Sequence, residues 1–86
     1  MRDLEKIYKA VANRRRLSVI KLLKSKKEAS VGDISEHLKL SFRSTSRHLA
    51  ILKSVDIIDR NQKGLLVFYH LNPDYHPAIK HLLTLV

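Results

Sequence analysis

The 86-residue chain carries 17 Lys and Arg against 8 Asp and Glu, so its formal net charge is +9 with neutral histidines. A chain of this length forms one domain that buries roughly 60–65% of its unfolded surface, which excludes a large enzyme with a deep cleft. The absence of cysteine excludes disulfides, thiolate metal sites and cysteine nucleophiles. The longest apolar run, Leu65 to Tyr69, is far shorter than the ~20 residues that span a bilayer. We therefore expect a cytoplasmic protein with no membrane partner, whose positive charge favours binding to a polyanion.

The first third of the chain is predicted to form two helices. Apolar residues recur at i, i+3, i+4 and i+7 over about 2–12, which gives the first helix one apolar stripe. Four apolar residues, Leu17, Ile20, Leu22 and Leu23, predict a second helix over about 14–25. Basic residues at its end suit the negative end of a helix dipole. The first stripe consists of Leu4, Ile7, Tyr8 and Val11.

Two serines are predicted to start the next two helices. Ser30 and Asp33 have the spacing of a capping box, which predicts a short helix that ends near Lys39. Ser41 can cap a further helix over 41–55. At 100° per residue, one side of that helix is apolar and predicted to be buried, and the opposite side carries basic and small residues. The residues predicted to be buried are Phe42, Thr45, Leu49 and Leu52.

The sequence period changes after Val55. Short runs rich in Ile, Val and aromatic residues over 57–62 and 65–71 are joined by Lys63 and Gly64, which predicts a β-hairpin because Gly supplies a positive φ. A final helix is predicted over about 75–86, again with apolar residues at helical spacing. The predicted fold is therefore mainly α with one small β-hairpin, in a single domain over 1–86. The final stripe consists of Ile79, Leu82, Leu83 and Val86.

Positive charge is concentrated in the middle of the chain, since no acidic residue lies in 37–55. A short helix, a brief turn and a basic second helix form the arrangement that reads the DNA major groove, where Arg43 and Arg47 could reach guanine. The hairpin adds Arg60 and Lys63, which could reach a phosphate or an adjacent minor groove as a wing. Leu65 and Leu66 make this wing more apolar than a phosphate clamp. Arg14, Arg15 and Arg16 cannot share one helical face, so at most one or two of them are expected to contact DNA.

Three segments resemble the ArsR/SmtB winged helix-turn-helix regulators. Residues 40–53 resemble that family's recognition helix, 10–17 the start of its second helix, and 64–71 its second wing strand. The resemblance covers nearly the whole chain and implies a winged helix-turn-helix fold and a homodimer that binds an operator. It also implies DNA contacts at Ser44, Ser46, Arg47 and His48, and dimerisation through the terminal helices, about 2–12 and 75–86. The apolar stripes of those helices agree with this expectation. The predicted interface residues are therefore Leu4, Ile7, Tyr8, Val11, Ile79, Leu82, Leu83 and Val86.

The chain departs from the family where many members bind metal. Ser30 and Gly32 stand in place of the thiolates of the family's cysteine box. Asp74 and His76 match the first half of a second family site, but its second half would lie beyond Val86, so we expect them to cap the last helix or line the dimer seam. We predict no metal and no cofactor, and the sequence leaves the effector, if there is one, open.

Two departures carry specific expectations. Asp56 stands where family members commonly have Gly, and a left-handed Asp costs roughly 1 kcal/mol relative to Gly. His48 lies at the edge of the basic face, where a protonated ring could pair with a phosphate. This predicts DNA binding that tightens below about pH 6.5.

The sequence as a whole predicts a dimeric transcriptional repressor that reads double-stranded DNA with helix 41–55 and the flanking groove or backbone with wing 57–71. The alternative is a winged-helix module that binds RNA or an acidic protein without reading sequence, because the fold does not fix function. A hydrolase is disfavoured by the lack of a nucleophile elbow or P-loop, and membrane binding by an N-terminal stripe without Trp or Phe. The predicted DNA-contacting residues are Arg43, Ser44, Ser46, Arg47, His48, Arg60 and Lys63.

Overall fold

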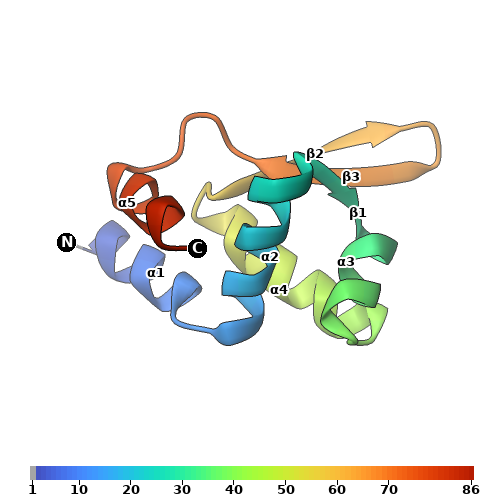
Figure 1. The fold of residues 1–86 in the computed structure, drawn as a ribbon, viewed down its shortest axis with the longest axis horizontal. Coiled ribbons are helices and arrows are strands. Elements are labelled where there is room, and N and C mark those ends of the chain that lie inside the picture. Colours follow the sequence, from blue (N-terminus) through green and yellow to red (C-terminus); the bar gives the residue numbers. More distant parts are fainter. Residues whose placement is uncertain (1) are drawn as a thin grey trace.

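The computed structural model describes residues 2–86, and within them five helices and three strands follow the predicted order with one addition, a short strand (Figure 1). The helices are α1 (Arg2–Val11), α2 (Arg14–Lys26), α3 (Val31–Leu38), α4 (Phe42–Ser54) and α5 (Pro77–Leu85). The strands are β1 (Glu28–Ser30), β2 (Ile58–Lys63) and β3 (Leu66–Leu71). The predicted fold class, mainly α with a β-hairpin, is confirmed.

The hairpin is part of a three-stranded antiparallel sheet with strand order β1-β3-β2. The sequence does not predict β1, because three residues are too few to show an alternating pattern and their partner on β3 is distant along the chain. The turn lies at Gly64 and Leu65, one residue later than predicted. Gly64 has a φ of +64°, the positive value that a tight hairpin turn requires.

Local side-chain caps position the two helices of the helix-turn-helix. The Oγ of Ser30 accepts a hydrogen bond from the backbone N–H of Asp33, whose carboxylate accepts one from the N–H of Ser30, so the predicted capping box is confirmed. The Oγ of Ser41 accepts from the N–H of Ser44 at 3.0 Å. Both caps satisfy helix amides that would otherwise have no intrahelical partner.

The core is built around α2, which contacts the other four helices and strands β1 and β3. Thr45, Leu49 and Leu52 of α4 are buried as predicted. The prediction for Phe42 was wrong, because this side chain is 64% exposed. Phe42 is the first residue of α4, and a cleft separates that first turn from the wing, so no element covers the ring there. The buried apolar residues are Ile7, Ala10, Val19, Ile20, Leu23, Ala29, Ile34, Leu49, Leu52, Ile57, Ile58, Tyr69 and Ile79.

The molecule is elongated, with extents of 37, 23 and 22 Å along its principal axes. Helices α1 and α5 and both ends of the chain lie at one end, and the turn of the wing lies at the other (Figure 1). The Nζ of Lys24 in α2 holds α5 by donating hydrogen bonds to the carbonyl oxygens of Leu83, at 2.6 Å, and Val86, at 3.1 Å. No helix within residues 2–86 combines the length and the apolar character that crossing a membrane requires.

Candidate nucleic-acid interface

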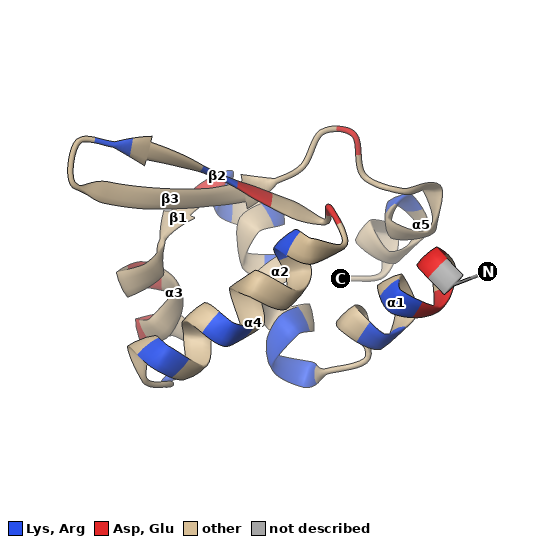
Figure 2. Ribbon diagram, turned by 180° about the vertical axis from the view of Figure 1, so that it is seen from behind, with Lys and Arg blue, Asp and Glu red and all other residues tan. Residues whose placement is uncertain are grey.

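The outward face of α4 is basic and free of acidic residues. Arg43, Ser44 and Arg47 are all exposed there, and neither guanidinium forms an ion pair within residues 2–86. Figure 2 shows Lys and Arg along the α4 ribbon and on the adjoining first turn of α2, with Asp and Glu confined to other elements. This face can offer positive charge and donor groups to a polyanion without first breaking an internal pair.

Ser46 and His48 flank this face and are only partly exposed. Ser46 lies on the side of the wing, where it lines the cleft between α4 and the hairpin. His48 lies on the side of α2, where its Nδ1 is 3.2 Å from Nη1 of Arg16. Because an arginine can only donate, Nδ1 of His48 accepts this hydrogen bond and the ring is neutral.

Arg16 ties three helices together. Its Nε donates to the carbonyl oxygen of Ala10 and its Nη2 to that of Lys9, so the side chain satisfies the last turn of α1 while contacting His48 on α4. The sequence does not reveal this role, because the three partners are distant from one another along the chain. Arg14 and Arg15, in contrast, are exposed at the start of α2.

Two backbone amides in the first turn of α2 are already occupied. The Oδ1 of Asn13 accepts from the backbone N–H of Arg15 at 2.9 Å and of Arg16 at 3.1 Å. A phosphate near this helix would therefore meet mainly the exposed side chains of Arg14 and Arg15.

The pKa of His48 is lowered from its ordinary value of 6.5, first by burial and then by the positive charges of Arg16, Arg15 and Arg47. Protonation would also convert Nδ1 into a donor facing the Arg16 guanidinium. In the free protein the ring therefore takes up its proton below pH 6.5, which is lower than the sequence-based expectation assumed.

The wing presents its two predicted basic residues in different directions. Arg60 stands opposite Tyr69 in the ladder and lines the cleft that faces α4. Lys63 lies on the other face of the sheet, where its Nζ is 2.8 Å from Oε1 of Glu28 in β1 and 5.1 Å from the centre of the Phe68 ring. Sequence reasoning missed this pairing because it did not find β1.

An apolar rim surrounds the cleft between α4 and the wing. The cleft has a volume of about 440 Å³, and its margin includes Phe42, Leu65 and Leu66, which are 64%, 99% and 58% exposed. Its polar lining includes Ser46 and Arg60. The basic face of α4 and the wing are therefore joined by one continuous surface.

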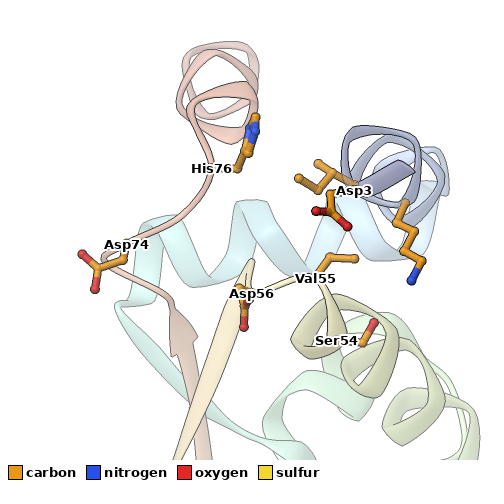
Figure 3. A pocket seen from close by; sticks show the side chains of 8 residues that line it. Asp3, Ser54, Val55, Asp56, Asp74 and His76 are labelled. Atoms are coloured by element: carbon orange, nitrogen blue, oxygen red, sulfur yellow. The ribbon is translucent and has the colours of Figure 1, made fainter. Parts of the chain in front are cut away.

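A second hollow, of about 420 Å³, lies among α1, the end of α4 and the loop before α5 (Figure 3). Asp74 and His76 both line it, but the carboxylate of Asp74 is turned away from the His76 ring. The Nδ1 of His76 accepts a hydrogen bond from the N–H of Ala78 at 3.0 Å, which confirms His76 as the cap of α5. No cluster of three or more His, Cys, Asp or Glu residues suited to a metal occurs among residues 2–86 of the single chain.

The predicted dimer residues differ in how much surface they expose. Ile7 and Ile79 are 6% and 1% exposed, so they belong to the core of the single chain and offer almost no surface to a partner. Tyr8 is 56% exposed, and Leu85, which the stripe of the last helix did not include, is 69% exposed. Leu4, Val11, Leu82, Leu83 and Val86 are half-buried.

Residues 13–60 match the family model for bacterial regulatory proteins of the arsR family. The chain belongs to the ArsR family. The transcriptional repressor SdpR of Bacillus subtilis (strain 168) is 36% identical to it over 69 residues, which are 80% of this chain and 76% of SdpR. The transcriptional activator HlyU of Vibrio cholerae is 36% identical over 77 residues, which are 90% of this chain and 70% of HlyU.

Solved ArsR-like structures have the same fold. The structure of HlyU from Vibrio cholerae superposes with a TM-score of 0.82 at 32% identity and covers 96% of this chain and 86% of that one. The crystal structure of the transcriptional repressor PagR of Bacillus anthracis superposes with a TM-score of 0.80 at 27% identity and covers 98% and 92%. This ArsR protein is a DNA-binding transcriptional regulator with a winged helix-turn-helix fold, and it is not an enzyme.

Proposed function

We propose that this ArsR protein is a homodimeric repressor that binds a palindromic site in double-stranded DNA, with α4 in the major groove of each half-site. The observation that carries the proposal is the outward face of α4, where Arg43 and Arg47 are exposed and unpaired among the described residues and Ser44 allows close approach. Guanidinium groups at the start of a recognition helix suit the two acceptors of guanine.

The residues around α4 complete the proposed DNA surface. Ser46 contacts the strand nearest the wing, and Arg60 contacts the backbone that passes through the cleft. His48 contacts a phosphate through Nε2, because its Nδ1 is held by Arg16. Lys63 can join this surface only by leaving Glu28, and exposed ion pairs of this kind are weak.

The dimer forms in this proposal through α1 and α5, as elements of the single domain over 1–86. These two helices flank an apolar hollow of about 180 Å³, lined by Tyr8, Leu82 and Leu85 among others. A two-fold axis at this end would set two copies of α4 side by side. Each copy would then face one of two successive major grooves, which are about 34 Å apart on one side of DNA.

Repression requires only that the dimer bind within a promoter, because the bound dimer then excludes other proteins from the same DNA. The names of SdpR and PagR support this assignment, and the name of HlyU, an activator, supplies the competing one. The proposal needs no cofactor, metal or small-molecule effector, and it places the protein in the cytoplasm with the DNA.

Selection from a random duplex pool, followed by sedimentation of the protein with and without the selected duplex, tests the proposal. The expected result is an inverted repeat bound by two chains. Transcription in vitro from a promoter that contains the site should fall as protein is added. Enrichment of no sequence, or preferential binding to RNA or to an acidic protein, would contradict the proposal.

Two matched variants of α5 test the dimer. Leu85→Asp places a charge on the exposed apolar surface and should yield monomers and weaken binding to the repeat. Thr84→Asp introduces the same charge at the adjacent exposed position and should leave the dimer intact. Equal effects of the two variants would contradict an interface at this end of the molecule.

A further inference from the structure

The C-terminal end of α1 is held by a side chain of α2. The carbonyl oxygens of Lys9 and Ala10 accept hydrogen bonds from Nη2 and Nε of Arg16. The backbone N–H of Asn13 does not serve Lys9, because it donates to the carbonyl oxygen of Val11 at 2.8 Å. Arg16 thus satisfies two carbonyl groups that the end of a helix leaves without an intrahelical partner.

The same guanidinium reaches α4. Nη1 of Arg16 donates to Nδ1 of His48 at 3.2 Å, and the first turn of α2 lies between α1 and α4 (Figure 2). Arg16 is half-buried and forms no ion pair within residues 2–86, so its charge is directed to these hydrogen bonds. A charged donor makes each of them stronger than a hydrogen bond between neutral groups.

Packing alone joins α1 and α4 incompletely. Ile7 of α1 is buried in the core, but a hollow of about 420 Å³ lies between α1 and the second half of α4. The residues that line it include Lys9 of α1, Ile51 of α4 and Arg16 itself. The bridge from Arg16 to His48 therefore connects the two helices beside a gap that apolar side chains do not fill.

The two helices that this bridge connects have separate tasks in the proposed function. Helix α1 belongs to the proposed dimer interface, and α4 reads DNA. In a two-fold dimer, the separation of the two copies of α4 depends on how firmly each copy is fixed to the interface. One additional base pair between the half-sites moves them apart by about 3.4 Å and rotates one relative to the other by about 34°. A dimer in which α4 shifts relative to α1 would accept such altered sites more readily.

We infer that Arg16 is a positioning residue that fixes α4 to the C-terminal end of α1 through His48, and that it thereby sets the half-site spacing that the dimer accepts. This inference rests on the proposed function and adds a determinant of its specificity. In this role Arg16 needs no contact with DNA, in contrast to the exposed Arg14 and Arg15 beside it.

Anisotropy titrations with inverted repeats of different spacing test the inference. The selected site is compared with duplexes whose half-sites are one base pair closer together or further apart. The ratio of Kd on an altered duplex to Kd on the selected one is the spacing penalty. Arg16→Met removes all three side-chain hydrogen bonds. It should raise Kd on the selected site about tenfold, roughly the worth of one hydrogen bond to a charged group. It should lower the spacing penalty by about threefold or more, because the two copies of α4 are then less firmly placed.

Three further variants separate positioning from other roles. Arg15→Met is the matched control, since it removes the same charge from the exposed neighbouring position. It should weaken binding equally on every duplex and leave the spacing penalty unchanged. His48→Leu leaves Arg16 bound to the carbonyl groups of α1, yet it should lower the spacing penalty as Arg16→Met does. His48→Gln keeps an acceptor for Nη1 and should retain a penalty close to that of the wild type. If Arg16→Met does not fold, the two His48 variants decide.

Two results would overturn the inference while leaving the proposed function intact. One is a wild-type spacing penalty in folded Arg16→Met or in His48→Leu, because the bridge would then serve only the stability of the single chain. The other is a monomeric Arg16→Met in sedimentation, because the arginine would then support the dimer interface and not the position of α4. Selection of no inverted repeat would instead remove the proposed function itself.

Discussion

Replacing Arg47 with Ala removes one exposed guanidinium from the centre of the outward face of α4 and leaves the core untouched. A bidentate contact to guanine is worth about 1–3 kcal/mol of discrimination, and a dimer presents the side chain twice. The expected loss is therefore about 2–6 kcal/mol, which corresponds to a rise in Kd of about 30-fold to more than 10⁴-fold on the selected site. On random DNA the variant loses only a phosphate contact, so the change should be a few-fold.

Anisotropy titrations with the selected duplex and a scrambled duplex, each at several salt concentrations, measure both numbers. Lys53→Ala is the matched control, because Lys53 is also exposed on α4 but lies six residues further along, about 9 Å along the axis and on a different side. The control should lose less than threefold on either duplex. Equal losses of Arg47→Ala on the two duplexes would refute base reading by this residue.

Three further predictions concern single residues. Burial and neighbouring arginines lower the pKa of folded His48 below 6.5, so the unfolded chain binds more protons than the folded one as pH falls. The contribution of neutral His48 to stability is therefore complete above pH 6.5 and is lost as pH falls through 6.5 to the folded pKa. Urea unfolding between pH 5 and 8 should show a smaller loss of stability for His48→Gln than for the wild type, and parallel curves would contradict this. Thr45 is fully buried and its Oγ1 has no hydrogen-bond partner among the described residues. Thr45→Val should therefore raise the unfolding free energy by about 1 kcal/mol, which corresponds to a rise in Tm of about 4–8 °C. A lower Tm of the variant in calorimetry would show that the hydroxyl group has a hydrogen-bond partner. Asp56 has a φ of +58°, so Asp56→Gly should also stabilise by about 1 kcal/mol in urea unfolding, whereas Asp56→Ala should not.

Much of the helical framework was predictable because helix starts are local. Ser30, Asp33 and Ser41 bond to amides within three residues of themselves, so their spacing alone locates α3 and α4. The left-handed conformation of Asp56 and the turn at Gly64 are local in the same sense. The charge pattern of α4 also follows from its sequence, since the exposed arginines occupy one side of a helix whose other side is apolar.

The candidate site was predictable only where exposure follows from helical phase. Arg43, Ser44 and Arg47 are exposed as expected, but phase could not show that Phe42 lacks a covering neighbour. The same limit applies to the terminal stripes. Helical spacing identified the side of α1 that is apolar, yet Ile7 on that side packs in the core of its own chain, and Tyr8 remains exposed.

The sequence by itself determined the class of fold and the basic surface: its length, its localised positive charge and its capped helices specify a small helix-turn-helix domain with one basic helix. Only the tertiary structure decided which groups are free to act. The pairing of β1 with β3 placed Glu28 beside Lys63, and the packing of α1, α2 and α4 placed Arg16 against His48. Such contacts join residues that are distant along the chain, and neither periodicity nor spacing carries information about them until the elements have packed.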